Sequence, residues 1–114
     1  MSIVTDRQDL ADALDPVAGV QGHKYRPRTL KTGDAWPLLD GLDRGPARDF
    51  EVTWRVVVIL PADERRASEW FDEHHELVAE ALEDFGYVER IEPGLVRTDA
   101  GDLQAMLITV RKEA

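Results

Sequence analysis

The chain has 114 residues, of which 43% are apolar and 32% are charged, a composition typical of one folded domain rather than of a disordered segment. It has no cysteine, which excludes disulfide bonds and thiol catalysis, and no apolar run approaches the ~18 residues that span a bilayer. A formal net charge of −9 argues against a protein whose main task is to bind nucleic acid.

The first predicted element is a short helix over residues 6–15. Thr5 and Gln8 have the spacing of a capping box, in which the Thr side chain caps the helix and the Gln side chain reaches back to it. Apolar residues then recur at helical spacing until Pro16 stops the pattern. A strand over Val17–Arg26 is expected next. The first residues have neither a basic start nor an apolar stretch, so we expect no signal peptide and a site of action in the cytoplasm.

Residues Pro27–Arg48 are predicted to form an extended excursion. The stretch is rich in glycine and proline, which favour turns, and it has room for a strand of its own. A large aromatic side chain in such a segment either folds back on the core or contacts a partner. We favour burial of Trp36 against the core, and we single out Asp34 and Trp36 as a candidate partner-contact loop if the segment instead meets a partner.

The clearest strand covers Phe50–Leu60, where side chains alternate between two faces. The two faces of this strand differ in polarity. The second face begins with polar Glu51 and ends with apolar Ile59, so we expect another part of the chain to cover its apolar end. The first face is apolar throughout and is expected to form the core, through Phe50, Val52, Trp54, Val56, Val58 and Leu60.

A long amphipathic helix follows Pro61. Asp63 is positioned to cap its first turn, and Gly86 follows where a C-terminal cap is expected. Between them, apolar residues at spacings of three and four predict one buried stripe. The stripe consists of Ala67, Trp70, Phe71, His74, Leu77, Val78, Ala81, Leu82 and Phe85.

Two strands, Tyr87–Val96 and Leu103–Arg111, come after this helix and are joined as a hairpin by a turn at residues 98–102. The order of these elements predicts a single α+β domain over residues 1–114. We expect two layers, a mostly antiparallel sheet with two helices packed on one face. Such a domain leaves its second sheet face and its edges open, and these are common sites of association.

The sequence forms no complete catalytic or metal-binding pattern, and no cofactor is expected. Ser68, Asp72 and His75 lie at spacings of four and three on one helix but lack a nucleophile elbow, an oxyanion hole and an orienting partner. Asp72, His75 and Glu76 offer oxygen and nitrogen ligands, yet no second histidine-rich segment completes a metal site. His74 lies on the apolar stripe and is expected to be a buried, hydrogen-bonded histidine.

Charge is unevenly distributed along the chain. Residues 23–48 carry six basic and three acidic side chains, whereas residues 61–86 carry nine acidic and two basic ones. A basic segment that meets the acidic helix of another copy explains this separation; a solvated edge strand protected by charge is the alternative. A phosphate-binding role is disfavoured because Tyr25 is the only aromatic residue between the bases. The candidate subunit interface consists of Lys24, Arg26, Arg28 and Lys31, facing Asp72, Glu73, Glu76, Glu80 and Glu83.

Over nearly its whole length the chain resembles the tail-terminator proteins of long-tailed bacteriophages. The resemblance lies in the short N-terminal helix, the Gly33-Asp34-Ala35-Trp36-Pro37 stretch, the Trp54–Pro61 strand, the helix that bears Trp70 and the closing hairpin. It implies a subunit of a hexameric ring that caps the tail tube, ends its polymerisation and joins the tail to the head connector.

The same resemblance implies the partners and the location. The partners are further copies of the chain, the tail-tube protein and the head–tail connector protein, and the location is the tail or neck of a virion assembled in the cytoplasm of a host bacterium. The family has no catalytic residues to carry over. An acidic ring would let DNA pass through its lumen without specific binding, and no membrane is involved.

Two other functions stay open beside this one. The first is another head–tail connector or neck protein of similar size. The second is a small regulatory module that binds a peptide or a small ligand on the open sheet face. An enzyme ranks third, because no residue pattern supports a complete active site.

Overall fold

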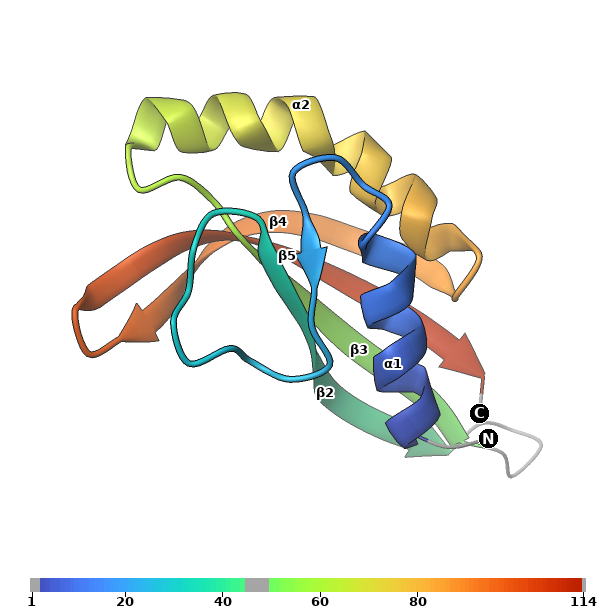
Figure 1. Ribbon diagram of the computed structural model, residues 1–114. Coiled ribbons are helices and arrows are strands. Elements are labelled where there is room, and N and C mark those ends of the chain that lie inside the picture. Colours follow the sequence, from blue (N-terminus) through green and yellow to red (C-terminus); the bar gives the residue numbers. More distant parts are fainter. Residues whose placement is uncertain (1–2, 45–49, 114) are drawn as a thin grey trace.

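The computed structural model describes residues 3–44 and 50–113 of the chain. Within these residues, two helices, α1 (Ile3–Leu14) and α2 (Glu64–Glu83), lie on one face of a five-stranded sheet (Figure 1). The predicted α+β fold with two layers is therefore confirmed. The strands are β1 (Gln21–Gly22), β2 (Asp34–Arg44), β3 (Phe50–Ile59), β4 (Tyr87–Thr98) and β5 (Gly101–Glu113).

The strand order in the sheet is β1-β2-β3-β5-β4. The pairs β2–β3, β3–β5 and β4–β5 are antiparallel, whereas the two-residue β1 pairs in parallel with the start of β2. The prediction of a mostly antiparallel sheet is thus also confirmed. We call the side of the sheet that carries the helices the inner face and the opposite side the outer face.

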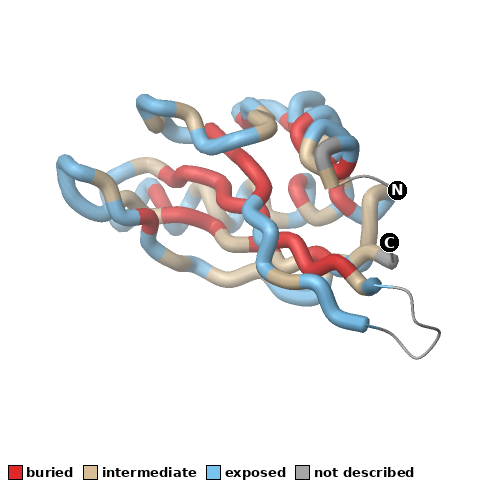
Figure 2. The backbone as a smooth tube through the Cα atoms, turned by 90° about the horizontal axis from the view of Figure 1, so that it is seen from below, coloured by how far each residue is buried: buried red, intermediate tan, exposed pale blue. Residues whose placement is uncertain are grey.

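The main core lies between the inner face and the two helices. Leu10 and Leu14 of α1 and Val78 and Leu82 of α2 are fully buried there, together with Trp54 of β3. The central strands contain the longest buried stretches of the backbone (Figure 2). The predicted core face of β3 is confirmed apart from its first residue, because Phe50 is 43% exposed.

A second apolar cluster lies on the outer face. It covers the apolar end of β3, so the expectation that another part of the chain covers this end is confirmed. The covering residue from outside the sheet is Leu30, in the segment between β1 and β2. The buried members of the cluster are Trp36, Val57, Ile59, Val96 and Ala105.

The predicted start of the first helix is wrong. α1 begins at Ile3, so Thr5 lies inside the helix, and the Gln8 Nε2 atom donates to Asp12 Oδ1 at 2.8 Å instead of reaching back. The residues before Asp6 continue the helical turn, and a long-range ion pair holds this part of the helix against the sheet. Asp6 is 1% exposed and lies 3.0 Å from Lys112 Nζ, which fixes the first turn of α1 against the end of β5.

The α2 prediction is largely confirmed. Asp63 caps the helix, and its Oδ2 atom accepts a hydrogen bond from the Arg66 backbone nitrogen at 3.1 Å. The helix ends at Glu83, and the Gly86 backbone nitrogen donates to the Leu82 carbonyl at 3.1 Å. One member of the predicted buried stripe departs from it: the exposed fraction of Leu77 is 48%.

The predicted strand over Val17–Arg26 is wrong except at Gln21–Gly22. Only these two residues pair with β2, because the chain then leaves the sheet edge for the outer face. The excursion over Pro27–Arg48 does contain a strand, β2, and its residues 45–48 lie outside the described part of the chain. The hairpin of β4 and β5 is confirmed and is longer than expected, with Gly101 in the left-handed region at a φ of 122°.

Candidate functional site

The four candidate basic residues lie in the segment between β1 and β2, which we call the basic loop (residues 23–33). The chain reaches this loop from the helix side of the sheet, where Val20 joins the main core. It then crosses to the outer face, where Leu30 packs into the second cluster. The basic loop therefore wraps around one edge of the sheet.

Asp34 holds both ends of the basic loop. Its side chain is buried, and its Oδ1 atom lies 3.0 Å from His23 Nε2. Its Oδ2 atom accepts a hydrogen bond from the Lys31 backbone nitrogen at 2.9 Å. One carboxylate thus joins the first and last parts of the loop and closes it.

Trp36 lies under the same loop. It is 2% exposed and belongs to the outer-face cluster. The Arg26 guanidinium lies 5.8 Å from the centre of its ring, and the same guanidinium donates to the Arg97 carbonyl at 3.1 Å. Arg26 therefore connects the basic loop to the β4–β5 hairpin.

These positions correct the interpretation of Asp34 and Trp36 as a partner-contact loop. Both residues lie in β2, and both are buried at 2% exposure. The reason is the strand register: Trp36 pairs with Val57, so its side chain falls on the apolar end of the outer face. The favoured expectation, that Trp36 folds back and is buried, is confirmed.

The four bases lie in a loop and not on an edge strand. Arg26, Arg28 and Lys31 are exposed and Lys24 is half-buried, all in the loop. In the described part of the chain, none of the four forms an ion pair with an acidic side chain. Their charges are left for solvent or for a partner.

The acidic candidates form a continuous face on α2. Asp72, Glu73, Glu76, Glu80 and Glu83 are all exposed, on the side of the helix away from the core. Glu69, which is not among the residues predicted from the sequence, extends the row at spacings of three and four and pairs with Arg65 at 3.0 Å. We call the surface of Glu69, Asp72, Glu73, Glu76, Glu80 and Glu83 the acidic face.

The acidic face is unfavourable for the isolated subunit. Like charges at i, i+3 and i, i+4 destabilise a helix by about 0.2–0.5 kcal/mol per pair. Among the described residues, Glu69 is the one member of the face that forms an ion pair. The outer part of the basic loop cannot relieve this repulsion within one chain, because α2 and the outer face lie on opposite sides of the sheet (Figure 1).

Two adjoining clefts lie beside the basic loop on the outer side. One has a volume of about 570 Å³ and runs between the loop and the tip of the β4–β5 hairpin, with Arg26, Arg28, Arg97 and Asp99 among its lining residues. The other, of about 280 Å³, lies over the sheet and is lined in part by Arg55. Arg55 and Arg97 were not predicted as site residues, because no sequence pattern near either one indicates that it lies close to residues 26–28.

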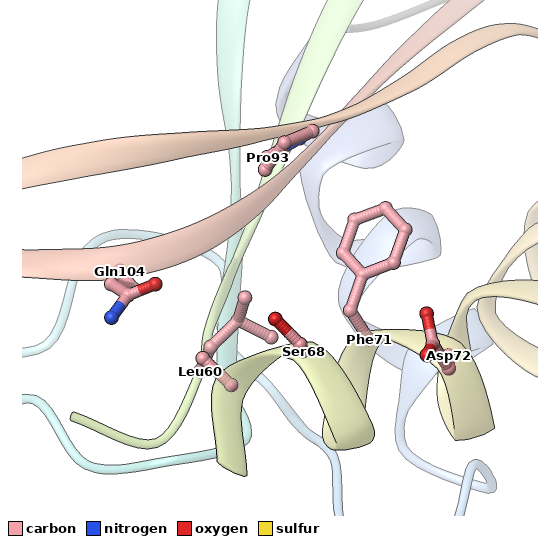
Figure 3. Close-up of a pocket in the computed structure, with 7 residues that line it drawn as sticks. Leu60, Ser68, Phe71, Asp72, Pro93 and Gln104 are labelled. Atoms are coloured by element: carbon pink, nitrogen blue, oxygen red, sulfur yellow. The ribbon is translucent and has the colours of Figure 1, made fainter. Parts of the chain in front are cut away.

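The pattern of Ser68, Asp72 and His75 is only partly brought together. Ser68 and Asp72 line a cavity of about 160 Å³ beneath the first turns of α2, with Phe71 directed toward the sheet (Figure 3). His75 is not among the lining residues of this cavity; its Nδ1 atom donates to the Phe71 carbonyl at 3.0 Å. His74 is half-buried, stacks on Trp70 and donates from Nδ1 to the Trp70 carbonyl at 2.8 Å.

Among residues 3–44 and 50–113, no group of three or more His, Asp or Glu side chains is placed to hold a metal ion. Neither α1 nor α2 is long and apolar enough to cross a lipid bilayer. A scan against known protein families finds no match, and no curated protein is significantly similar in sequence.

Proposed function

We propose that this chain is a structural subunit that assembles head to tail into a closed ring, and that the ring caps the tail tube of a long-tailed bacteriophage. In this role it ends tube polymerisation and joins the tail to the head connector. The proposal follows the resemblance noted in the sequence, and its physical basis is the distribution of charge on the folded subunit.

The observation that carries the proposal is the separation of two unpaired charged surfaces. Within the described chain, no base of the basic loop forms an ion pair with an acid of the acidic face. The two surfaces lie on different layers of the fold. The basic loop of one subunit can therefore pair with the acidic face of a second, while the basic loop of the second subunit stays available for a third. Repetition of such a heterologous contact gives a ring when the rotation closes.

The overall charge suits a ring that surrounds DNA. Each subunit has a formal net charge of −9. In the proposed ring, the exposed bases of the basic loop lie in the contacts between subunits. The assembled ring is then acidic on its remaining surface, which disfavours adhesion of phosphate groups to its lumen. DNA can therefore pass during packaging and ejection without being held.

Mass measurement in solution tests this proposal. At low ionic strength, light scattering should give a particle of about six times the subunit mass of 12.9 kDa, and electron microscopy should show closed rings. Added to purified tail tubes, the protein should be found at one end of each tube. A stable monomer that binds a small metabolite instead would contradict the proposal and favour a regulatory binding module.

A further inference from the structure

The outer face carries a groove with basic side chains around an apolar floor. We call it the outer groove, and it has a volume of about 280 Å³. Its lining residues include three arginines and no acid. The residues that matter for its chemistry are Arg26, Trp36, Leu38, Arg55, Val57 and Leu107.

Two features of the groove point to a ligand with both charge and apolar surface. Leu38 is 45% exposed; it lies in β2 beyond the two residues that pair with β1, beside Arg55 in the β2–β3 register. Arg55 has a weak contact with Asp40 at 3.7 Å, and both side chains are more than two-fifths exposed, so this ion pair leaves the guanidinium accessible. Arg26 is already oriented by its bond to the Arg97 carbonyl.

The acidic face of α2 has the complementary composition. Leu77 is 48% exposed and follows Glu73 by four residues and precedes Glu80 by three, so the leucine lies next to both glutamates on the helix surface. An apolar side chain among acids is what a groove with an apolar floor and arginine walls can accept. Its exposure in the free subunit is otherwise unfavourable.

We propose that the outer groove of one subunit binds α2 of the next subunit, with Leu77 packed against Leu38 and the flanking glutamates facing Arg26 and Arg55. This inference rests on the proposed ring function and specifies its joint: it adds Arg55, Leu38 and Leu77 to the interface. The occupant is a second copy of the chain, because the chain itself carries the complementary surface on its opposite layer.

Disulfide trapping tests the joint, and the absence of cysteine from the sequence makes the background clean. A mixture of Leu38→Cys and Leu77→Cys variants, oxidised at low ionic strength, should give a cross-linked dimer as the main product. Leu42→Cys is the matched control. Leu42 lies on the same strand with 44% exposure, but it pairs with Val52 and therefore faces the inner side.

A second variant tests the charges of the groove. The double substitution Arg26→Glu and Arg55→Glu should weaken self-association by about tenfold or more, because two attractions become repulsions. Circular dichroism checks that the variant is folded. If a labelled DNA duplex binds the wild-type protein at low salt and this variant abolishes that binding, the groove serves nucleic acid and the inference is wrong.

The outcomes separate this inference from the proposed function. Closed rings without the Leu38–Leu77 cross-link contradict the joint and leave the ring intact. A cross-link specific to Leu38 and Leu77 in open chains or dimers supports the joint and contradicts the ring. A monomer at low ionic strength that gives no cross-link contradicts both.

Discussion

At the scale of single residues, two buried tryptophans stabilise opposite sides of the sheet. Trp54 lies in the main core and Trp36 in the outer-face cluster, and each is 2% exposed or less. Each also has an arginine over its ring: Arg7 at 5.1 Å from the centre of Trp54, and Arg26 at 5.8 Å from that of Trp36. Loss of either indole should therefore remove both apolar packing and a cation–π contact.

Replacement of Trp36 by Ala should lower the free energy of unfolding by about 3–5 kcal/mol, similar to the effect of Trp54→Ala, because both leave a cavity in a packed cluster. Denaturant midpoints measure the change. Tyr25→Ala is the control, since Tyr25 is 58% exposed and its loss should change the midpoint little. A Trp36→Ala midpoint as high as that of Tyr25→Ala would contradict the assignment of Trp36 to a cluster.

The positions of Trp36 and Leu77 show what local pattern cannot predict. The burial of Trp36 depends on its pairing with Val57, a contact that the sequence near residue 36 does not encode. Leu77 fits the apolar spacing of α2 but lies at the margin of the buried stripe, where it stays 48% exposed. In both cases tertiary contacts decide exposure.

At the scale of elements, the basic loop is ordered by few interactions. Asp34 contacts His23 and Lys31, Arg26 contacts the hairpin, and Leu30 packs into the outer-face cluster. The remaining residues of the loop are largely exposed. The carboxylate of Asp34 is therefore one of the contacts that keep the bases in place, beside the backbone hydrogen bonds from His23 to the Ala35 carbonyl and from Gly33 to the Ile59 carbonyl.

Replacement of Asp34 by Ala should lower the free energy of unfolding by about 1–3 kcal/mol, because the Lys31 backbone nitrogen and His23 lose their buried partner. Amide hydrogen exchange should accelerate across residues 23–33 more than elsewhere. Asp40→Ala is the matched control, since Asp40 lies on the same strand with a side chain 45% exposed. Unchanged exchange in the loop of the Asp34 variant would show that other contacts hold it.

The elements that the sequence predicts well are those with local causes. The spacing of apolar residues and the Asp63 cap define α2, and strict alternation defines β3. The strand predicted over Val17–Arg26 shrinks to the two residues of β1, and the basic loop was not predicted, because the contacts that decide both are distant: Arg26 bonds to a carbonyl 71 positions away. The nine interface candidates lie in the basic loop and on the exposed side of α2, and their role in an interface stays a prediction, whereas Arg55, Arg97 and Glu69 follow only from the fold.

At the scale of the whole molecule, the basic loop reaches the outer side of the sheet, whereas the acidic face lies on the helix layer. Exposed charges interact weakly one at a time, roughly 0–1 kcal/mol per pair, but a closed ring repeats the same contact at every joint. Salt screens such contacts over a distance of about 8–10 Å. Association should therefore weaken as ionic strength rises, while the fold of each subunit is retained.

Reversal of the four loop bases tests the central claim most directly. A variant with Lys24, Arg26, Arg28 and Lys31 changed to Glu should stay folded by circular dichroism but sediment as a monomer at low salt, because every joint becomes repulsive. A control with Arg44, Arg65, Arg66 and Arg90 changed to Glu has the same net charge and should still assemble. Mixing the base-reversed variant with one whose acidic-face residues are changed to Lys should restore mixed particles. Normal assembly of the base-reversed variant at low salt would show that the basic loop is only a solvated edge and would contradict the account.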